Sequence, residues 1–253
     1  QIFQQVKVIA VYGGHDQELD GDIVVLTTHQ TYRYPQKFGL LIVDEYDAFP
    51  FEGNQVLQHF TNQSCFGKSI YLSATFQDED IKNKTYYELN KRFHQHPLPL
   101  PKIFVYSQLK SFVHLYHYLL CHHKTRYLFI YVPTIRMGKQ LSFFFSLLRM
   151  PHVFFSSRSA KDVFSEITTG RHHVVITTTI LERGITMADL HVLVYQADHP
   201  IFNFKTLVQI AGRVGRKAHS PTGDIYFYVR KKRKVHDQVV AYLHQINETM
   251  SAV

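Results

Sequence analysis

Short apolar runs rich in β-branched residues alternate with longer amphipathic stretches along the chain, and this alternation limits the folds open to it. In the first half, the runs that we predict as strands are residues 8–12, 23–27, 40–44 and 70–73. Between the last two, apolar residues recur at helical spacing within residues 54–63. Strands that alternate with helices are typical of βα units, so the sequence predicts an α/β fold with mostly parallel sheets.

A proline-rich segment interrupts this pattern. Residues 93–102 contain Pro97, Pro99 and Pro101, which forbid a helix and favour stiff, extended backbone. We place a domain boundary there, with residues 1–98 as a partial first domain and 99–253 as the second. After the prolines we predict strands at 128–132, 153–155, 173–177, 192–195 and 225–229, and helices at 109–121, 135–148, 160–168, 205–211 and 235–250. This set fits one complete α/β domain, whereas the elements before it are too few for one.

Composition narrows the partners and the compartment. A net charge of +8 and a pI near 9.3 favour a polyanionic partner such as nucleic acid. The two cysteines form no CxxC pair, so we expect neither a disulfide framework nor a zinc site. No apolar run reaches the roughly 18 to 20 residues of a membrane span. We therefore expect a cytoplasmic protein, with peripheral attachment to the inner face of the membrane left open.

Two arginines that each follow a glycine stand in the string QIAGRVGR, residues 209–216. Glycine lets a backbone approach a ligand closely, and the planar guanidinium groups of Arg213 and Arg216 match phosphate oxygens. Such a fork suits a polyphosphate. A basic helix end on a solvated surface explains the string equally well when it is taken alone.

An acidic pair favours the phosphate interpretation. The predicted strand at 40–44 ends in Asp44, and Glu45 follows it. One carboxylate can hold Mg²⁺ while its neighbour orients the attacking water in phosphoanhydride hydrolysis. Ser73 and Thr75 follow the next strand, so we expect them to lie at the same sheet edge and to hydrogen-bond to the acidic pair. An acidic loop that caps a helix is the alternative for the pair alone.

Other strings carry weaker signals. Gly67-Lys68-Ser69 does not complete a phosphate-binding loop, because that loop needs a glycine where Asn62 stands, and no other GxxxxGK[ST] occurs in the chain. Thr28 and His29 follow a predicted strand and suit contacts to a nucleic-acid phosphate, although a helix N-cap is an equal account. The basic run at 230–234 suits a phosphate backbone or, more simply, a solvated helix start.

Six strings, taken in order, resemble the motifs of superfamily 2 helicase-like ATPases, which are built on two RecA-like domains. They are TTHQ (27–30), VDEYDAFP (43–50), YLSAT (71–75), FIYVPT (129–134), TTILERGIT (178–186) and QIAGRVGR (209–216). Within that superfamily, the amino-acid sequence at residues 44–50, 92–101, 180–185 and 198–200 resembles that of the ComFA family, the ATPases of DNA uptake in bacterial natural competence. The resemblance covers nearly the whole chain, from about residue 8 to residue 229.

The resemblance implies a role for individual residues. Five residues are implied for catalysis. Asp44 would hold Mg²⁺ through the nucleotide, and Glu45 would orient water. Arg213 and Arg216 would reach the γ-phosphate of ATP across the domain cleft, with Gln209 nearby. Those implied for coupling to the nucleotide are Ser73, Thr75, Gly184 and Thr186. Those implied for DNA binding are Thr28, His29, Thr134, Thr178 and Arg183. Position 186 is Thr where many relatives in the wider superfamily carry Asp.

Two parts of the family pattern do not occur in this sequence, namely the Walker A loop and the four-cysteine zinc module. We therefore expect a fragment whose first domain is truncated at its N-terminus, and which hydrolyses no ATP by itself. The intact protein is expected to be an ATP-dependent single-stranded DNA translocase, with competence proteins at the membrane channel as partners. The alternatives are a duplex-unwinding helicase of the replication-restart type, or a non-catalytic nucleic-acid-binding module if the chain is complete.

Overall fold

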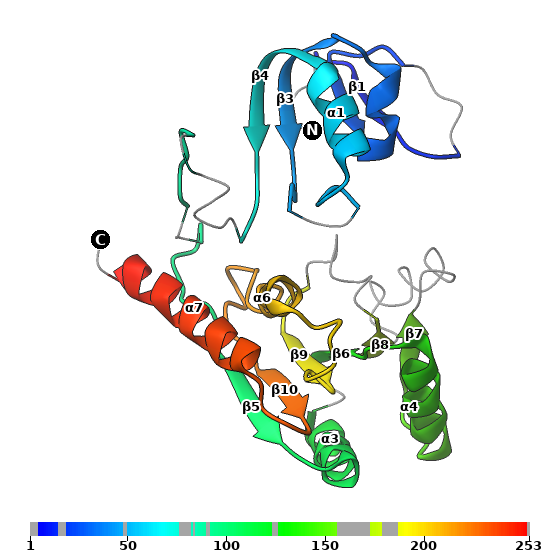
Figure 1. The fold of residues 1–253 in the computed structure, drawn as a ribbon. Helices are drawn as coiled ribbons and strands as arrows, with labels where there is room; N and C mark the ends of the chain where they lie inside the picture. Colours follow the sequence, from blue (N-terminus) through cyan, green and yellow to red (C-terminus); the bar gives the residue numbers. More distant parts are fainter. Residues whose placement is uncertain are drawn as a thin grey trace. The chain divides into compact units, whose positions relative to one another are not determined.

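The computed structural model describes residues 5–14, 19–47, 50–75, 82, 84–89, 92–122, 126–155, 173–178 and 187–251. The chain forms two compact units, Gln1–Tyr86 and Tyr87–Val253 (Figure 1). This division falls ahead of the boundary that we predict at 98/99. Arg92 and Leu98 explain the difference, because both hydrogen-bond to residues of the second unit.

The first unit contains two small parallel sheets. Strands β1 (Val8–Val11) and β2 (Ile23–Leu26) form one, and β3 (Phe38–Val43) and β4 (Cys65–Tyr71) form the other. A 3₁₀ helix, η1 (Thr28–Arg33), follows β2, and helix α1 (Gln55–Gln63) connects β3 to β4. The prediction of parallel α/β units is confirmed here, since both pairs run parallel.

Helix α1 begins where the sequence provides a cap. The side chain of Asn54 accepts a hydrogen bond from the backbone N–H of Leu57 (3.1 Å), which satisfies one of the free donors at the helix start. Leu57 packs with Leu41, Val43 and Phe51 in the small core of this unit.

The string Gly67-Lys68-Ser69 lies inside strand β4, which starts earlier than the predicted 70–73. A Cβ atom at Gly67 would stand 2.0 Å from the carbonyl oxygen of Gly39 in β3. The glycine therefore allows the two strands to approach each other, and this string has a structural role.

The second unit is built around one six-stranded sheet in the order β5-β10-β9-β6-β8-β7, in which every pairing is parallel. Its strands are β5 (Pro101–Val105), β6 (Tyr127–Tyr131), β7 (Val153–Phe155), β8 (Val174–Thr177), β9 (Leu190–Tyr195) and β10 (Ile225–Val229). Its described helices are α3 (Gln108–His122), α4 (Ile135–Leu147), α6 (Phe204–Ala211) and α7 (Lys234–Ser251). The helix predicted at 160–168 lies outside the described residues.

Helices cover both faces of this sheet (Figure 1). Helices α6 and α7 pack on the face that includes Phe129 and Val192, while α3 and α4 pack on the face that includes Leu128 and Leu193. Successive side chains of a strand point to opposite faces of the sheet. When helices cover both faces, both alternating sets of side chains must therefore be apolar. This requirement explains why the central strands read as unbroken apolar runs.

Strand β5 is not predicted from the sequence, because the prolines before it indicate only extended backbone. Pro101 is the first residue of β5, and β5 is an edge strand that pairs only with β10 among the described strands. Proline is tolerated at such a position because it need not donate to the sheet. The proline segment thus leads directly into the sheet.

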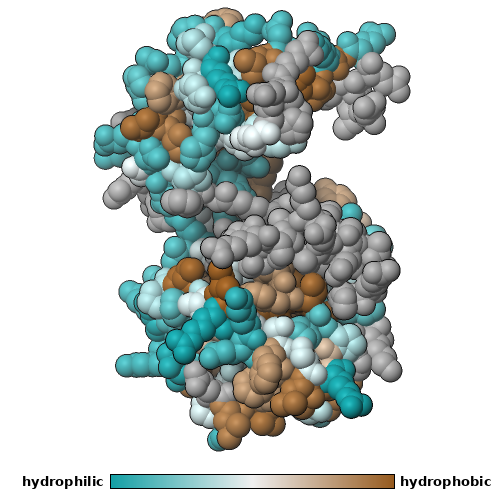
Figure 2. All heavy atoms as spheres, turned by 90° about the vertical axis from the view of Figure 1, so that its right-hand side faces the viewer, coloured by the Kyte–Doolittle hydropathy of each residue, from teal (hydrophilic) through white to brown (hydrophobic). Residues whose placement is uncertain are grey.

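Apolar side chains also lie on the outer surface of the second unit. Phe143 and Leu147 of α4 are 67% and 68% exposed, and hydrophobic patches are visible on this unit in Figure 2. Phe143, together with Arg136 and Lys139, borders an open hollow along α4. Among the described helices, none has the length and apolar content needed to cross a membrane.

Candidate nucleotide and nucleic-acid sites

The acidic pair lies at the carboxyl end of β3, as its position after an apolar run predicts. Asp44 is exposed and Glu45 is half-buried. Glu45 has a positive φ of 52°, and its backbone N–H donates to Oδ1 of Asp44 at 3.0 Å. This tight turn directs the chain away from the sheet immediately after the strand, and it leaves an accessible carboxylate at the strand end.

A third carboxylate, Asp47, connects the acidic loop to the string after β4. The hydroxyl of Thr75 donates to Oδ2 of Asp47, and both residues are buried. The hydroxyl of Ser73 accepts from the backbone N–H of Thr75 at 2.9 Å. We expected Thr75 to bond to the acidic pair, and this hydrogen bond goes to Asp47 instead. The signal was present in the sequence, because Asp47 stands in the same string two residues after Glu45.

Thr28 and His29 form the start of η1, beyond the end of β2. His29 is exposed and Thr28 is half-buried. The carbonyl oxygen of Thr28 accepts from the hydroxyl of Thr31 at 2.7 Å, and the side chain of Thr27 makes no capping hydrogen bond. The alternative interpretation of residues 27–30 was a helix N-cap, and the side chain of Thr27 does not form one.

The two arginines lie in the turn that follows α6, residues 212–216, which we call the arginine turn. Arg213 is only 7% exposed, and within the described residues its Nε has no hydrogen-bond partner. Arg216 is exposed, and its Nε donates to the carbonyl oxygen of Gly212 at 3.0 Å. Gln209, one turn earlier on α6, is half-buried. A buried N–H that lacks an acceptor is costly, so Nε of Arg213 is suited to an anionic ligand.

Arg92 and His94 contact the same turn, and neither was among the site residues found from the sequence. Arg92 donates to the carbonyl oxygens of Val214 and Gly215 at 3.0 and 2.6 Å, and His94 Nε2 lies 3.0 Å from that of Gly215. Burial, and next the positive charge of Arg216, lower the pKa of Arg92 to about 10. The contact could not be predicted from the sequence, because the two segments lie more than a hundred residues apart.

Thr134 and Thr178 follow the paired strands β6 and β8, at the same edge of the sheet. The exposed Thr134 caps α4, because its hydroxyl accepts from the backbone N–H of Met137 at 3.2 Å. The hydroxyl of Thr178 is buried and has no partner in the described part of the chain. Arg183, Gly184 and Thr186 lie outside the described residues.

The basic run at 230–234 leads into α7, which begins at Lys234, and several of its residues are paired. Arg230 Nε lies 3.7 Å from Oδ2 of Asp198, Arg233 donates to the carbonyl oxygen of Asp198 at 3.0 Å, and Lys232 pairs with Asp237 at 2.6 Å. These contacts agree with the simpler interpretation, in which the run starts a helix.

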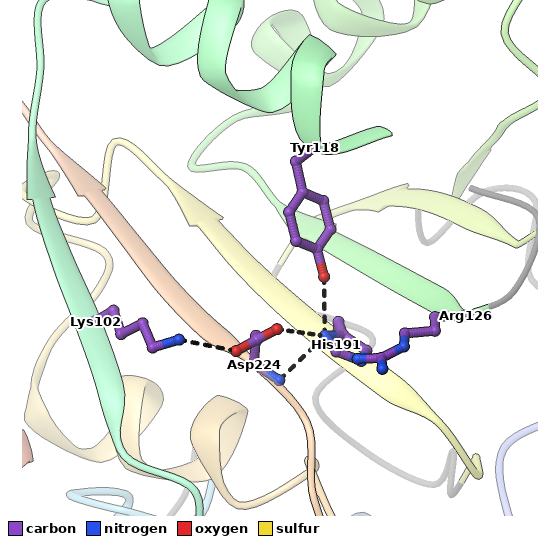
Figure 3. A network of polar contacts seen from close by, with 5 residues as sticks. All are labelled: Lys102, Tyr118, Arg126, His191 and Asp224. Atoms are coloured by element: carbon purple, nitrogen blue, oxygen red, sulfur yellow. Dashed lines mark hydrogen bonds and ion pairs between the residues drawn. The ribbon is translucent and has the colours of Figure 1, made fainter. Parts of the chain in front are cut away.

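Another polar network lies at the amino ends of the strands, on the side of α3 (Figure 3). Asp224 pairs with Lys102 at 3.1 Å and with Nδ1 of the buried His191 at 3.3 Å. Arg126 Nη1 lies 2.9 Å from His191 Nε2, and the hydroxyl of Tyr118 lies 2.8 Å from Nδ1. Burial acts to raise the pKa of Asp224, but the hydrogen bond and charge of Lys102 outweigh it and leave that pKa below its usual value.

Comparisons with known proteins agree with this architecture. Residues 101–218 match the helicase conserved C-terminal domain. The structure is similar to that of Saccharomyces cerevisiae Dbp5 bound to RNA and ADP BeF3, with a TM-score of 0.73, 16% identity, and coverage of 97% of this chain and 69% of that one. It is also similar to Mycobacterium smegmatis helicase Lhr bound to ssDNA and AMP-PNP, with a TM-score of 0.61, 16% identity, and coverage of 97% and 37%. The fold is thus that of the RecA-like domains of helicases, which confirms the predicted fold class.

Proteins with similar sequences identify the family within the helicase-like fold. The competence protein ComFA of Streptococcus pneumoniae is 35% identical over 243 residues, which cover 87% of this chain and 56% of that protein. ComFA of Bacillus subtilis is 31% identical over 272 residues, which cover 99% and 58%. The chain belongs to the ComFA family of superfamily 2 helicase-like proteins, as its motifs predicted. It spans less than two thirds of the length of these relatives.

Proposed function

We propose that the full-length protein is an ATP-driven motor that moves single-stranded DNA during uptake in natural competence. Membership of the ComFA family supports the role in competence. The observation that carries the ATP-dependent part is Arg213, a buried guanidinium whose Nε lacks an acceptor within the described residues. A transferring phosphoryl group supplies an acceptor of the right charge and geometry.

The residues at the carboxyl end of β3 fit Mg²⁺ and ATP. Mg²⁺ binds proteins through one or two carboxylates and completes its shell with water and phosphate oxygens. The exposed Asp44 fits that need, and we assign to its neighbour Glu45 the role of orienting a water molecule. Bound Mg²⁺ would neutralise charge on the phosphates. Arg213 and Arg216, with Gln209, would stabilise the charge that develops on the γ-phosphate.

Thr75 and Asp47 are the residues that we propose for coupling. Their hydrogen bond ties the loop that carries Asp44 to the segment after β4, together with Ser73. A change in this loop during hydrolysis would therefore be transmitted to the neighbouring segment. Gly184 and Thr186 are proposed for the same role from the motif alone.

Hydroxyls and basic groups at strand ends are proposed to bind DNA. Thr134 and Thr178 share one sheet edge of the second unit, and Thr28 with His29 follows β2 of the first. Hydroxyl contacts to phosphates position a strand without reading its sequence, which suits a transport motor. Arg183 is added from the motif. We propose that the motor works at the cytoplasmic side of the membrane channel, with other competence proteins as partners.

Replacement of Arg216 by alanine in the full-length protein tests this function. Loss of an arginine that stabilises phosphoryl transfer lowers the rate by about 10³- to 10⁵-fold in related chemistry. We expect the DNA-stimulated ATPase rate to fall by a factor in this range, while Lys217→Ala, an exposed neighbour, leaves it unchanged. Wild-type turnover in the Arg216 variant would rule out the assignment. Strand displacement by the wild-type protein would instead indicate a duplex-unwinding helicase.

A further inference from the structure

The arginine turn needs external support, because it lies beyond the end of a short helix. Helix α6 ends at Ala211, and the last carbonyl groups of a helix lack partners within it. Backbone hydrogen bonds shape the turn, among them those from Arg213 N–H to the carbonyl oxygen of Ile210 (3.1 Å) and from Val214 N–H to that of Ala211 (3.2 Å). The carbonyl groups of residues 212, 214 and 215 need other donors.

Arg92 supplies those donors. Its Nη1 donates to the carbonyl oxygens of Val214 (3.0 Å) and Gly215 (2.6 Å), and its Nη2 donates to that of Gly212 (3.3 Å). The same Gly212 oxygen accepts from Nε of Arg216 at 3.0 Å. One carbonyl group thus joins the supporting arginine to one of the two arginines proposed to bind phosphate.

The turn is also confined at Gly215. Gly215 has a φ of +68°, and a Cβ atom there would stand 2.1 Å from the carbonyl oxygen of Pro221 and 3.1 Å from Nη1 of Arg92. His94 Nε2 makes a further contact to the carbonyl oxygen of Gly215. The backbone that carries both arginines is therefore packed closely against both Pro221 and the Arg92–His94 segment.

The segment that carries Arg92 is itself fixed to the second unit. The N–H of Leu98 donates to Oδ1 of Asn247 at 2.7 Å, and Nδ2 of Asn247 donates back to the carbonyl oxygen of Leu98 at 2.9 Å. Asn247 belongs to the long helix α7. Residues 92–98 are thus held at both ends, by the arginine turn and by α7.

We propose that Arg92 is a positioning residue that holds the arginine turn in the geometry from which Arg213 and Arg216 stabilise phosphoryl transfer. This inference rests on the proposed function of the two arginines. Arg92 contacts backbone carbonyls and acts through the turn, so it is not a phosphate ligand. A guanidinium is suited to this role because its planar fork reaches three carbonyl oxygens together, which a lysine ammonium cannot do in the same geometry.

The charge of Arg92 adds to this role. Its pKa is lowered to about 10, by burial and then by the nearby charge of Arg216. Binding of an anion by Arg216 would relieve that repulsion. The support of the turn and the occupancy of the phosphate site are therefore expected to strengthen each other.

The test compares Arg92→Ala, Arg92→Lys and Arg216→Ala in the full-length protein, with Lys110→Ala, an exposed residue of α3, as control. A displacement of about 1 Å at a catalytic group can lower the rate on the order of 10²-fold. We expect Arg92→Ala to lower the kcat of the DNA-stimulated ATPase by that order with little change in the KM for ATP. Arg92→Lys should recover part of the loss, and Lys110→Ala should have no effect.

Hydrogen exchange separates positioning from general stability. In Arg92→Ala, the amides of residues 208–216 should exchange faster while those of β9 and β10 stay protected, and Arg92→Lys should show the same local change at smaller size. An unchanged kcat in Arg92→Ala beside a lost activity in Arg216→Ala would overturn the inference and leave the proposed function standing. Full activity in both variants would overturn both. Loss of protection throughout the sheet, in the alanine and lysine variants alike, would also overturn it, because the role would then be structural.

Discussion

Buried charged groups and their partners define the chemistry of this protein at the scale of single residues. Asp47 is buried and accepts a hydrogen bond from Thr75, whereas Arg213 is buried with an unsatisfied Nε in the described part of the chain. Burial of a charged group is costly unless it is paired. Asp47 thus has a partner within the fold, whereas Nε of Arg213 has none among the described residues, which supports the proposal that it binds a phosphate.

We expect Thr75→Ala to destabilise the first unit, because it removes a donor from a buried carboxylate. The loss of one partner of a buried polar group costs about 1–3 kcal/mol. Hydrogen exchange across a urea series, read from residues of β3 and β4, measures the free energy of unfolding of this unit separately. Thr75→Ser retains the hydroxyl and should lie close to the wild type. Equal stability of the alanine variant would show that the hydrogen bond contributes nothing.

The strands and turns that carry the site depend on close backbone approaches at the scale of elements. Strand β4 approaches β3 at Gly67, and the arginine turn approaches Pro221 at Gly215. Both glycines are required because a Cβ atom would overlap a carbonyl oxygen. The elements are therefore positioned by backbone contacts as well as by apolar packing.

Gly67→Ala tests the approach of β4 to β3. The new Cβ would stand 2.0 Å from the carbonyl oxygen of Gly39, so the strands must separate. We expect the first unit to lose stability by at least the 1–3 kcal/mol or so that is typical of overpacking. Gly39→Ala is the matched control, because its Cβ would meet only the Phe66 ring, at 3.5 Å. Equal unfolding free energies for the two variants would contradict this account of Gly67.

The network at the start of β10 predicts a pH dependence for the second unit. Because the pKa of Asp224 is lower in the folded state, its contribution to stability is present above the unfolded value of about 3.9 and is lost as the pH falls through the folded value. Lys102→Met removes the main stabilising partner and should reduce this acid sensitivity. Hydrogen exchange of β9 and β10, compared between the variant and the wild type at each pH, measures it. A constant difference between pH 6 and pH 3 would contradict the prediction.

At the scale of the whole molecule, the chain combines one complete six-stranded sheet with a smaller unit of two strand pairs. The carboxylates proposed for Mg²⁺ belong to the first unit, and the arginine turn belongs to the second. We propose that both sets are needed for hydrolysis. The division 1–98 and 99–253 stays a prediction for functional domains.

The isolated 253-residue chain is expected to bind single-stranded DNA without hydrolysing ATP. It contains no GxxxxGK[ST] loop to hold the β- and γ-phosphates, while its net charge is +8. Fluorescence anisotropy with a labelled oligonucleotide should show an affinity that falls steeply with salt, because bound phosphates release counterions. Calorimetry with ATP should show no binding in the micromolar range. Micromolar ATP affinity, or DNA affinity independent of salt, would contradict these expectations.

Local patterns in the sequence were sufficient for the elements and for the family. Strands such as β10 and helices such as α4 follow from apolar periodicity and from caps that lie within a few residues. The ordered motifs likewise identify the ComFA family, because each motif is contiguous. Sequence alone therefore determined the α/β class, the family, and the positions of Asp44, Arg213 and Arg216 along the chain.

Only the tertiary structure decided which groups meet. Thr75 and Asp47 are hydrogen-bonded although they lie 28 positions apart in the sequence. Arg92 contacts the arginine turn across more than a hundred positions. No periodicity links such residues, since their contact depends on how strands and helices pack. The use of Gly67 inside β4 was equally hidden, because its reason is a neighbouring backbone. Local preference fixes elements, whereas packing brings distant polar groups together and thereby forms the site.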